Sequence, residues 1–312
     1  MDFKKISLVI PFYNESKKIV KSTKNILKQI DRPDEIIFVN NNSNDNSELK
    51  LRLFLKNFNN INSKNKIKII KNKTKQYPST AKNIGIKLAS YKNVAFFDIG
   101  LSINNYFISN LKKKISPNER EYIQGCYFFK SKNSLDRAYL MQTYGMNRLG
   151  SCIPSSCFKK SLFNKIGYFQ HFRSGYDRVF LNNLKIKKFS SKINFESPVN
   201  YLDDISGSSL TKIFRKILYY SYSTVGLKNY HIDKAYIFLF ILFMVISSIG
   251  YMSQFLMIYL FFRCVFIPIK KNFKSKIKKI EIYDFVMVPI IGILIDIARV
   301  LGFLSGHIKR LI

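Results

Sequence analysis

Four short apolar runs, which start about thirty residues apart, constrain the fold of this chain most strongly. They are ISLVIPF (6–12), EIIFVN (35–40), KIKIIK (66–71) and NVAFFDI (93–99). This spacing is the length of a βαβ unit, and an unbroken apolar run is typical of a strand that is buried on both faces. Helix-like stretches fill the gaps at 15–30, 47–58 and 79–90, and the first of them places Ile19, Thr23, Ile26 and Ile30 on one face. The pattern predicts an α/β fold with a Rossmann-like, mostly parallel sheet.

Polar residues follow three of these runs, where the strands are expected to end. The first run leads into PFYNE (11–15), the second into NNNSND (40–45), and the fourth into Asp98 and Gly100. The helix-like stretch before the fourth run opens with STAKNIG (79–85). Because open parallel sheets bind ligands beyond the carboxyl ends of their strands, we expect these groups to converge on one edge. Taken alone, Asp98 could equally be a residue that forms a turn.

The sequence contains no glycine-rich phosphate loop, since neither GxGxxG nor GxxxxGK[ST] occurs in it. A diphosphate bound at the predicted edge would therefore need a divalent cation. Asp98 is the expected metal ligand, because Mg²⁺ and Mn²⁺ prefer carboxylate oxygen and share their other positions with phosphate and water.

The formal charge of +33 makes nucleic acid, anionic lipid and phosphorylated substrates the partners to consider. The lysines are scattered along the chain, and no zinc-finger or RNP-like motif accompanies them, so we expect no nucleic-acid partner. Some of the charge follows simply from the heavy use of lysine throughout. The four cysteines form no CxxC pair, which argues against structural zinc and for reduced thiols in a cytosol.

The composition changes after Tyr230, because residues 235–269 contain a single charged side chain, Arg263. As a helix this run would be roughly 50 Å long, well beyond one ~30 Å hydrocarbon core. A hairpin that turns near Ser247–Gly250 would return the lysine-rich segment 270–279 to the cytosolic face, whereas one long span would not. We therefore favour a transmembrane hairpin over a single long span.

A second apolar segment, 284–310, carries Asp296 and Arg299 one turn apart. Burying this pair in lipid would be costly. We therefore favour a helix that lies in the membrane–water interface, with both side chains solvated, over a spanning helix. The N-terminal apolar run is too short for a signal peptide. We expect a membrane protein whose N-terminal domain lies on the cytoplasmic face, against an anionic membrane surface.

The strings SLVIPFYNES, EIIFVNNNSNDNS, STAKNIGIKLAS and NVAFFDIG resemble the successive motifs of family 2 glycosyltransferases. A later string, SLFNKIGYFQHFRSGYDRVFLNNLKI, resembles the family's region in which an acidic pair opens a helix after the acceptor loop. The resemblance covers about residues 5–225, with the motifs in the expected order. It implies an inverting enzyme with a GT-A fold that uses a nucleotide-sugar.

The resemblance also implies roles for individual residues. Asp98 corresponds to the first carboxylate of the family's Asp-x-Asp element and would hold Mg²⁺ or Mn²⁺, while Asp177 corresponds to the catalytic base. The residues that would bind the nucleotide-sugar are Pro11, Tyr13, Glu15, Asn40, Asn42, Lys82 and Asp98. Among these, Asn40 would read the base, and Lys82 replaces an arginine that lies near the base or the phosphate. Asp177 could alternatively be an ordinary first-turn acid.

Three positions depart from the family pattern. Asn40 stands where an aspartate is usual, and Gly100 replaces the second acid of Asp-x-Asp, which leaves one carboxylate for the metal. The acidic pair is reduced to Tyr176-Asp177. With Gly100 at the second position, the resemblance implies an Asp-x-Gly subtype of the family.

Together these features predict three segments. We expect a GT-A catalytic domain at 1–225, an amphipathic connection and transmembrane hairpin or single long span at 226–269, and a basic loop with an interfacial or transmembrane helix at 270–312. The predicted reaction moves a sugar from a nucleotide-sugar, preferably a UDP-sugar, to a hydroxyl of a lipid-linked or cell-surface glycan. The alternatives are a polyprenyl-phosphate glycosyltransferase, a non-catalytic nucleotide-sugar-binding relative, and a basic membrane-surface protein.

Overall fold

The computed structural model describes residues 2–59, 66–115, 121–146, 149–201, 209–228, 231–248, 250–272 and 281–311. These form two compact units, which we call the sheet unit and the helical unit. The sheet unit consists of Met1–Phe128, Leu149–Phe172 and Tyr176–Leu202, and the helical unit of Phe129–Arg148, Arg173–Gly175 and Asp203–Ile312. The expected domain boundaries at 225 and 269 stay predictions, and most of the lysine-rich segment lies outside the described residues.

The sheet unit contains the four expected strands, β1 (Ile6–Phe12), β2 (Glu35–Asn40), β3 (Lys66–Lys71) and β4 (Asn93–Phe96). They are parallel and lie in the order β3-β2-β1-β4. Because β2 and β4 lie on opposite sides of β1, the strand order reverses at β1. This reversal is where an open α/β sheet binds its ligands.

The described sheet continues beyond β4 in mixed directions. β7 (Leu149–Lys159) pairs antiparallel with β4 and with β6 (Tyr122–Phe128). Three short strands, β5 (Leu101–Ser102), β8 (Ser191–Ile193) and β9 (Val199–Tyr201), complete it, with β8 and β9 both parallel to β6. The prediction of an α/β, mostly parallel sheet is confirmed.

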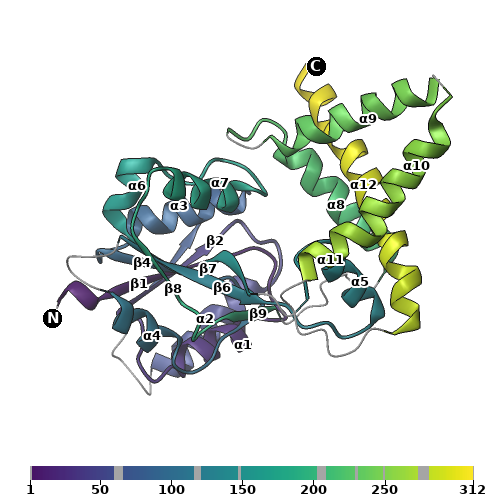
Figure 1. The fold of residues 1–312 in the computed structure, drawn as a ribbon. Coiled ribbons are helices and arrows are strands. Elements are labelled where there is room, and N and C mark those ends of the chain that lie inside the picture. Colours follow the sequence, from purple (N-terminus) through teal and green to yellow (C-terminus); the bar gives the residue numbers. More distant parts are fainter. Residues whose placement is uncertain are drawn as a thin grey trace. The chain divides into compact units, whose positions relative to one another are not determined.

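Helices cover both faces of the sheet (Figure 1). One face carries α1 (Ile19–Leu27), α2 (Ser47–Asn59) and α4 (Phe107–Lys114), and the other carries α3 (Pro78–Leu88), α6 (Lys160–Ile166) and α7 (Tyr176–Ile186). A hydrophobic core lies on each face of the sheet, and alternate residues of β1 point into the two cores. Leu8 packs in the core on the α1 side and Val9 in the core on the α3 side. The expectation that Ile30 lies on the buried face of the first helix is wrong. That helix ends at Leu27, and Ile30 is 64% exposed.

Helix α3 packs onto β1 unusually closely, and this contact brings its side chains to the sheet edge. A Cβ added at Gly85 would lie only 2.2 Å from Val9 Cγ1, so the approach requires glycine. Lys82, about one turn before Gly85, thereby reaches the carboxyl end of β4. The glycine is thus part of what positions the site.

The helical unit is built from α5 (Ser134–Gln142), α8 (Leu210–Thr224), α9 (Ile232–Ser248), α10 (Met252–Leu260), the π-helical segment η2 (Phe261–Phe266), α11 (Ile267–Asn272) and α12 (Ile282–Leu311). Helices α8 and α12 meet through a GxxxG motif. Added Cβ atoms would lie 2.4 Å from Leu218 O at Gly302 and 2.8 Å from Tyr222 O at Gly306. Small residues at this spacing let two helix backbones approach closely, as they do between membrane helices.

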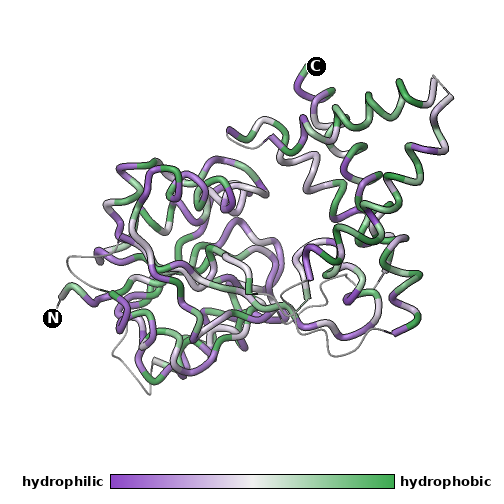
Figure 2. The backbone as a smooth tube through the Cα atoms, viewed as in Figure 1, coloured by the Kyte–Doolittle hydropathy of each residue, from purple (hydrophilic) through white to green (hydrophobic). Residues whose placement is uncertain are grey.

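Among the described residues, two helices are long and apolar enough to cross a membrane, Met252–Asn272 and Ile282–Leu311. The apolar run 235–269 is divided at Gly250, whose φ of 83° is left-handed, into α9 and the helix that begins at Met252. Phe243 and Phe255 pack across this turn with ring centroids 5.6 Å apart. Both helices are strongly apolar (Figure 2). That they form a transmembrane hairpin stays a prediction.

We expected the side chains of Asp296 and Arg299 to be solvated, but within the helical unit both have partners in the protein. Asp296 Oδ2 lies 2.6 Å from Arg263 Nε, and their side chains are only 18% and 4% exposed. The hydroxyls of Tyr236 and Tyr259 also donate to Asp296, and Arg299 donates to Tyr236. Pairing from other helices satisfies these charges, which removes the reason for preferring an interfacial helix over a spanning one.

Candidate active site

The loops that follow β1 and β2 are joined by hydrogen bonds between their backbones and short side chains. Ser43 Oγ accepts from Asn14 N at 3.0 Å, and Ser47 Oγ accepts from Glu15 N at 2.7 Å. Asp45 Oδ2 accepts from Ser16 N at 3.0 Å, so this aspartate closes the loop. Pro11, Tyr13 and Glu15, all half-buried, therefore lie beside the residues that follow β2.

Asn40 is enclosed by this loop structure. It is 1% exposed; its Oδ1 accepts from Ser43 N at 2.8 Å, and its Nδ2 donates to Glu48 Oε2 at 2.5 Å. Burial pushes the pKa of Glu48 up, but hydrogen bonds from Asn40 and Arg52 outweigh it and hold that pKa below its usual value. Both polar ends of the Asn40 amide thus have partners within the protein. Asn42, half-buried, has a left-handed φ of 61° in the same loop.

The segment after β3 joins the same edge. Asn41 Nδ2 donates to Gln76 O at 2.6 Å, and Gln76 N donates to Asn41 Oδ1 at 3.0 Å. Lys75 Nζ lies 4.3 Å from the centroid of the Tyr13 ring, a cation–π contact. An aromatic face and a cation are therefore adjacent beside the ends of β1 and β3.

Lys82 and Asp98 form an ion pair where β4 ends. Lys82 Nζ lies 2.7 Å from Asp98 Oδ1, and the side chains are 2% and 37% exposed. Burial lowers the pKa of Lys82, but the nearby Asp98 and Tyr176 outweigh burial, so the pKa is raised and the ammonium stays charged. Phe97 N donates to Val9 O at 3.1 Å, which places the residue after it, Asp98, beside the carboxyl end of β1.

Asp177 lies in the first turn of α7, where its Oδ1 accepts from Arg178 N at 2.8 Å. Burial raises the pKa of Tyr176 to about 12, against the effect of Lys82, and the charges of Asp98 and Asp177 add to the rise. The same two carboxylates also add to the effect of burial on the Cys152 thiol, whose pKa is well above its usual value. Asp177 thus directly follows Tyr176, the residue whose ring centroid lies 6.0 Å from Lys82 Nζ.

Gly100, two residues after Asp98, has a backbone conformation that favours glycine. Its φ is +87°, a conformation that side chains other than glycine adopt at a cost. Ser22 Oγ accepts from Gly100 N at 3.2 Å, and an added Cβ would lie 3.6 Å from Lys18 Nζ. A lysine side chain thus borders the place where a second carboxylate would begin.

The donor set suits a cation that is held mostly by its substrate. No cluster of three His, Cys, Asp or Glu side chains able to hold a metal lies within the described part of the chain. Asp98 is one partly exposed carboxylate, and Mg²⁺ commonly binds through one or two carboxylates together with substrate phosphates and water. The residues present therefore fit a divalent ion only in company with a diphosphate.

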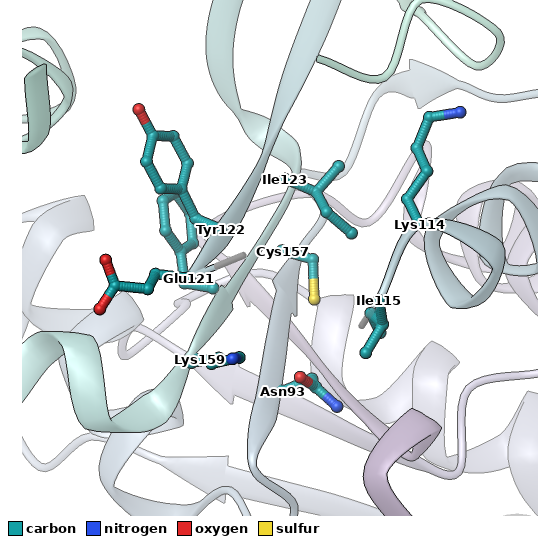
Figure 3. Close-up of a pocket in the computed structure, with 9 residues that line it drawn as sticks. Asn93, Lys114, Ile115, Glu121, Tyr122, Ile123, Cys157 and Lys159 are labelled. Atoms are coloured by element: carbon teal, nitrogen blue, oxygen red, sulfur yellow. The ribbon is translucent and has the colours of Figure 1, made fainter. Parts of the chain in front are cut away.

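Two hollows lie at the opposite edge of the sheet and are not this site. The one in Figure 3 has a volume of about 10 Å³, enough for about one water molecule, and is lined by Asn93, Tyr122 and Cys157 among others. A neighbouring hollow of about 620 Å³ is lined by Asn93, Ser90 and Lys160 among others. Asn93 is the first residue of β4, whereas Asp98 follows its last, and neither hollow includes an expected site residue.

Some residues around the site were not expected from the sequence. Tyr176 contacts the Lys82 ammonium, with Nζ 6.0 Å from the ring centroid, and Lys18 borders Gly100. Ser79 and Asn83, on either side of Lys82, hold the chain that leads to Asp177. The string STAKN offered a signal, since its spacing places Ser79, Lys82 and Asn83 on one face of a helix.

The sheet unit thus combines a Rossmann-like sheet with a lysine–carboxylate pair at the carboxyl edge of its parallel strands. The model of the family "Glycosyl transferase family 2" matches residues 7–184, more than half of the chain, and the chain belongs to that family. The mannosyltransferase PcManGT from Pyrobaculum calidifontis, solved with GDP-Man and Mn²⁺, shares the fold. Its TM-score is 0.53 at 11% identity, over 98% of this chain and 87% of that one.

Two curated relatives are similar over shorter stretches. Glycosyltransferase GlyG of Streptococcus pneumoniae serotype 4 is 28% identical over 123 residues, which is 39% of either chain. The UDP-Glc:alpha-D-GlcNAc-diphosphoundecaprenol beta-1,3-glucosyltransferase WfgD of Escherichia coli is 28% identical over 138 residues, 43% of this chain and 50% of WfgD. The chain thus spans half or less of the length of the curated relatives it matches.

Proposed function

We propose that this protein is an inverting glycosyltransferase that moves a sugar from a nucleotide-sugar to a hydroxyl of a lipid-linked or cell-surface glycan. The observation that carries the proposal is the contact of Lys82 with both Asp98 and Tyr176, the residue before Asp177, at the carboxyl edge of the sheet. A UDP-sugar is the favoured donor, and the name of WfgD, which gives UDP-Glc and a diphosphoundecaprenol-linked sugar, supports both donor and acceptor class.

In this proposal Asp177 is the catalytic base. It removes the proton from the acceptor hydroxyl, which must come within hydrogen-bond reach of the carboxylate. The acceptor oxygen then attacks the anomeric carbon from the face opposite the diphosphate, which inverts the configuration. Tyr176, kept neutral by burial, precedes this base in the chain and contacts the Lys82 ammonium.

Lys82 and Asp98 would stabilise the diphosphate leaving group. The charged Lys82 ammonium stabilises the negative charge that grows on the departing diphosphate, and burial strengthens that interaction. Asp98 would hold Mg²⁺ or Mn²⁺, which when bound supplies further positive charge at the same oxygens.

The loops after β1, β2 and β3 would bind the nucleotide. Tyr13 offers an aromatic face beside Lys75, and Pro11, Glu15 and Asn42 line the same edge. Because both ends of the Asn40 amide already bond within the protein, its contribution would be to fix the loop around the base. The two long apolar helices would keep the domain on the cytoplasmic face of an anionic membrane.

A hydrolysis screen with UDP- and GDP-sugars on the full chain in detergent tests the proposal, because slow hydrolysis identifies the donor before any acceptor is known. We expect release of one nucleotide, stimulated by Mn²⁺ or Mg²⁺. Calorimetry with UDP and GDP is the companion measurement. The absence of both hydrolysis and nucleotide binding would contradict the proposal. Nucleotide binding without turnover would indicate a non-catalytic relative.

A further inference from the structure

Helices α9 and α10 form a hairpin that the rest of the described helical unit does not cover. Its two ends meet α12, and its turn points away from that helix (Figure 1). No described residue within 234–262 is buried, and exposed apolar side chains lie all round α9, as at Phe238, Leu239 and Ile241. A helix that is apolar all round belongs in a protein core or in lipid. Because a protein partner would cover only one side of the hairpin, lipid is the surrounding that fits its whole surface.

The base of the hairpin is polar. The Tyr236 hydroxyl of α9 donates to Asp296 Oδ1 at 3.1 Å, and Arg263 Nε of η2 lies 2.6 Å from Asp296 Oδ2. Arg263 Nη1 also donates to Gln142 Oε1 of α5 at 2.9 Å. Further along the same leg, Lys271 Nζ donates to Gln142 O at 2.7 Å. These contacts tie the base of the hairpin to polar groups of α5 and α12.

The apolar legs beyond this base are too short to cross a membrane. At 1.5 Å per residue, α9 extends about 18 Å from Tyr236 to Ser248, and the second leg extends about 16 Å from Met252 to Arg263. A hydrocarbon core is ~30 Å thick, so one leaflet contributes about 15 Å of it. A hairpin whose base lies at one membrane surface would therefore reach the middle of the bilayer and not its far face.

The turn of the hairpin is itself suited to lipid. The sequence has no charged side chain within 235–262. Ser247 Oγ donates to Met244 O at 2.7 Å. Ser248 Oγ donates to Val245 O, also at 2.7 Å. Both hydroxyls are thus satisfied within α9, as polar groups in hydrocarbon must be.

Helix α12 shows an exposed apolar stripe along its length. The members of the stripe follow one another at intervals of four and seven residues, which places them on one side of the helix. They are between 41% and 57% exposed, and they are Val286, Ile290, Ile297, Leu301 and Ile308. A one-sided stripe of this kind is typical of a helix that lies in the membrane–water interface.

Helix α8, which packs on the opposite side of α12, argues against a spanning α12. The two helices run parallel, because the first glycine of the GxxxG motif lies against Leu218 and the second against Tyr222. Lys212 and Arg215, both exposed, precede Leu218 by nearly two turns and by one turn, so they lie beside the middle of α12. A spanning α12 would carry both charges into the hydrocarbon, which is costly.

We propose that the helical unit is held by one leaflet of a lipid bilayer. Helix α12 lies in the interface on its apolar stripe, and the α9–α10 hairpin is re-entrant, with its turn near the bilayer centre. This arrangement differs from the transmembrane hairpin expected from the sequence, in which the turn would emerge on the far face. The inference goes beyond the proposed function, because it concerns how the chain meets the membrane and does not depend on sugar transfer.

A pair of single-tryptophan variants tests the inference, because the sequence contains no tryptophan of its own. Tyr251→Trp places the probe at the turn and Ile297→Trp in the middle of the α12 stripe, at positions that are 62% and 50% exposed. The full-chain variants are reconstituted into phosphatidylcholine–phosphatidylglycerol vesicles that contain lipids brominated at different depths of the acyl chain. We expect the fluorescence of Tyr251→Trp to be lost most with bromines near the chain ends. That of Ile297→Trp should be lost most with bromines near the headgroups.

Tyr219→Trp on α8 is the matched control, since this position is exposed at 43% on the charged helix. It should be quenched by acrylamide from the water and little by any brominated lipid. A spanning arrangement predicts the reverse order, with Tyr251→Trp shallow at the far face and Ile297→Trp deep, and that result would overturn the inference. Equal depths for the two variants, whether shallow or deep, would also overturn it. If no lipid quenches either variant while UDP still binds, the unit does not enter a bilayer, and the inference fails while the proposed sugar transfer stands.

Discussion

Lys82 Nζ lies 2.7 Å from Asp98 Oδ1, so a fully buried ammonium faces a carboxylate that remains partly open to solvent. This asymmetry matters for function. A buried cation interacts strongly with an incoming anion, while the open carboxylate can still accept a second ligand. The pair joins the helix that follows β3 to the end of β4, and it has Tyr176 of α7 as its neighbour.

Replacing Lys82 by methionine should abolish most of the transferase activity. The variant loses the ammonium beside the leaving group, and removal of one preorganised electrostatic group typically costs about 10²–10³ in kcat. Lys82→Arg, which keeps the charge, is the control and should retain measurable turnover. Steady-state kinetics with the donor found in the hydrolysis screen check this, and equal rates for the methionine variant and the parent would exclude a role for the charge.

Asp98→Asn should weaken the effect of divalent cations on nucleotide binding. The amide keeps the size of the side chain but offers no charge to Mg²⁺ or Mn²⁺. Calorimetry of UDP with and without Mn²⁺ should show a metal-dependent gain in affinity for the parent and a much smaller gain for the variant. The same gain in both would mean that the cation, if used, is held elsewhere.

Gly85→Ala should destabilise the sheet unit by about 1–3 kcal/mol, because its new methyl group would press on Val9. The second change Val9→Ala removes the methyl groups that the new Cβ would press on. The double variant should therefore recover part of the lost stability. Urea midpoints, read by circular dichroism in constant detergent, give the comparison. If Gly85→Ala unfolds at the parent's midpoint, the close approach of α3 to β1 is not required.

Glu35 should make the protein sensitive to acid. Its buried carboxylate accepts from Ser7 Oγ at 2.6 Å and Ser90 N at 2.8 Å and pairs with Lys68 at 2.7 Å. Burial alone would raise the pKa of Glu35, but these partners outweigh it and lower the pKa from 4.5 to about 2. The corresponding stabilisation, about 3 kcal/mol, is complete above pH 4.5 and is lost as the pH falls toward 2.

The pH dependence is measured as the midpoint of thermal unfolding between pH 6 and pH 3. Glu35→Gln, which cannot titrate, should flatten this dependence relative to the parent. Glu196→Gln is the control, because that carboxylate is 60% exposed and should change the profile little. An unchanged profile in Glu35→Gln would show that other groups control acid unfolding.

Much of the fold could be predicted from the sequence, because four apolar runs at βαβ spacing leave few alternatives to a parallel sheet. The loops after those runs were also predictable as a group, since the carboxyl ends of parallel strands share one edge. What the sequence could not reveal were partnerships set by packing. Asp296 pairs with Arg263 from another helix rather than with Arg299 on its own, and Ile30 is exposed because α1 ends one turn earlier.

In the candidate site, too, individual residues could be identified from the sequence but their contacts could not. Asp98 was identifiable from its place at a strand end, but its pairing with Lys82 depends on the close packing of α3 at Gly85. The full use of the Asn40 amide by Glu48 and Ser43 depends on how the loop folds back onto α2. Such contacts join residues whose chemistry is visible in the sequence but whose proximity is not.

In the proposed reaction Asp177 is the base, and Lys82 and Asp98 support the transfer. We would measure the rate of transfer by Asp177→Asn in detergent, beside UDP binding by calorimetry. We expect kcat to fall by at least about 100-fold, typical for removal of a general base, with the Kd for UDP within about twofold of the parent. Transfer at the parent's rate would show that Asp177 is not the base.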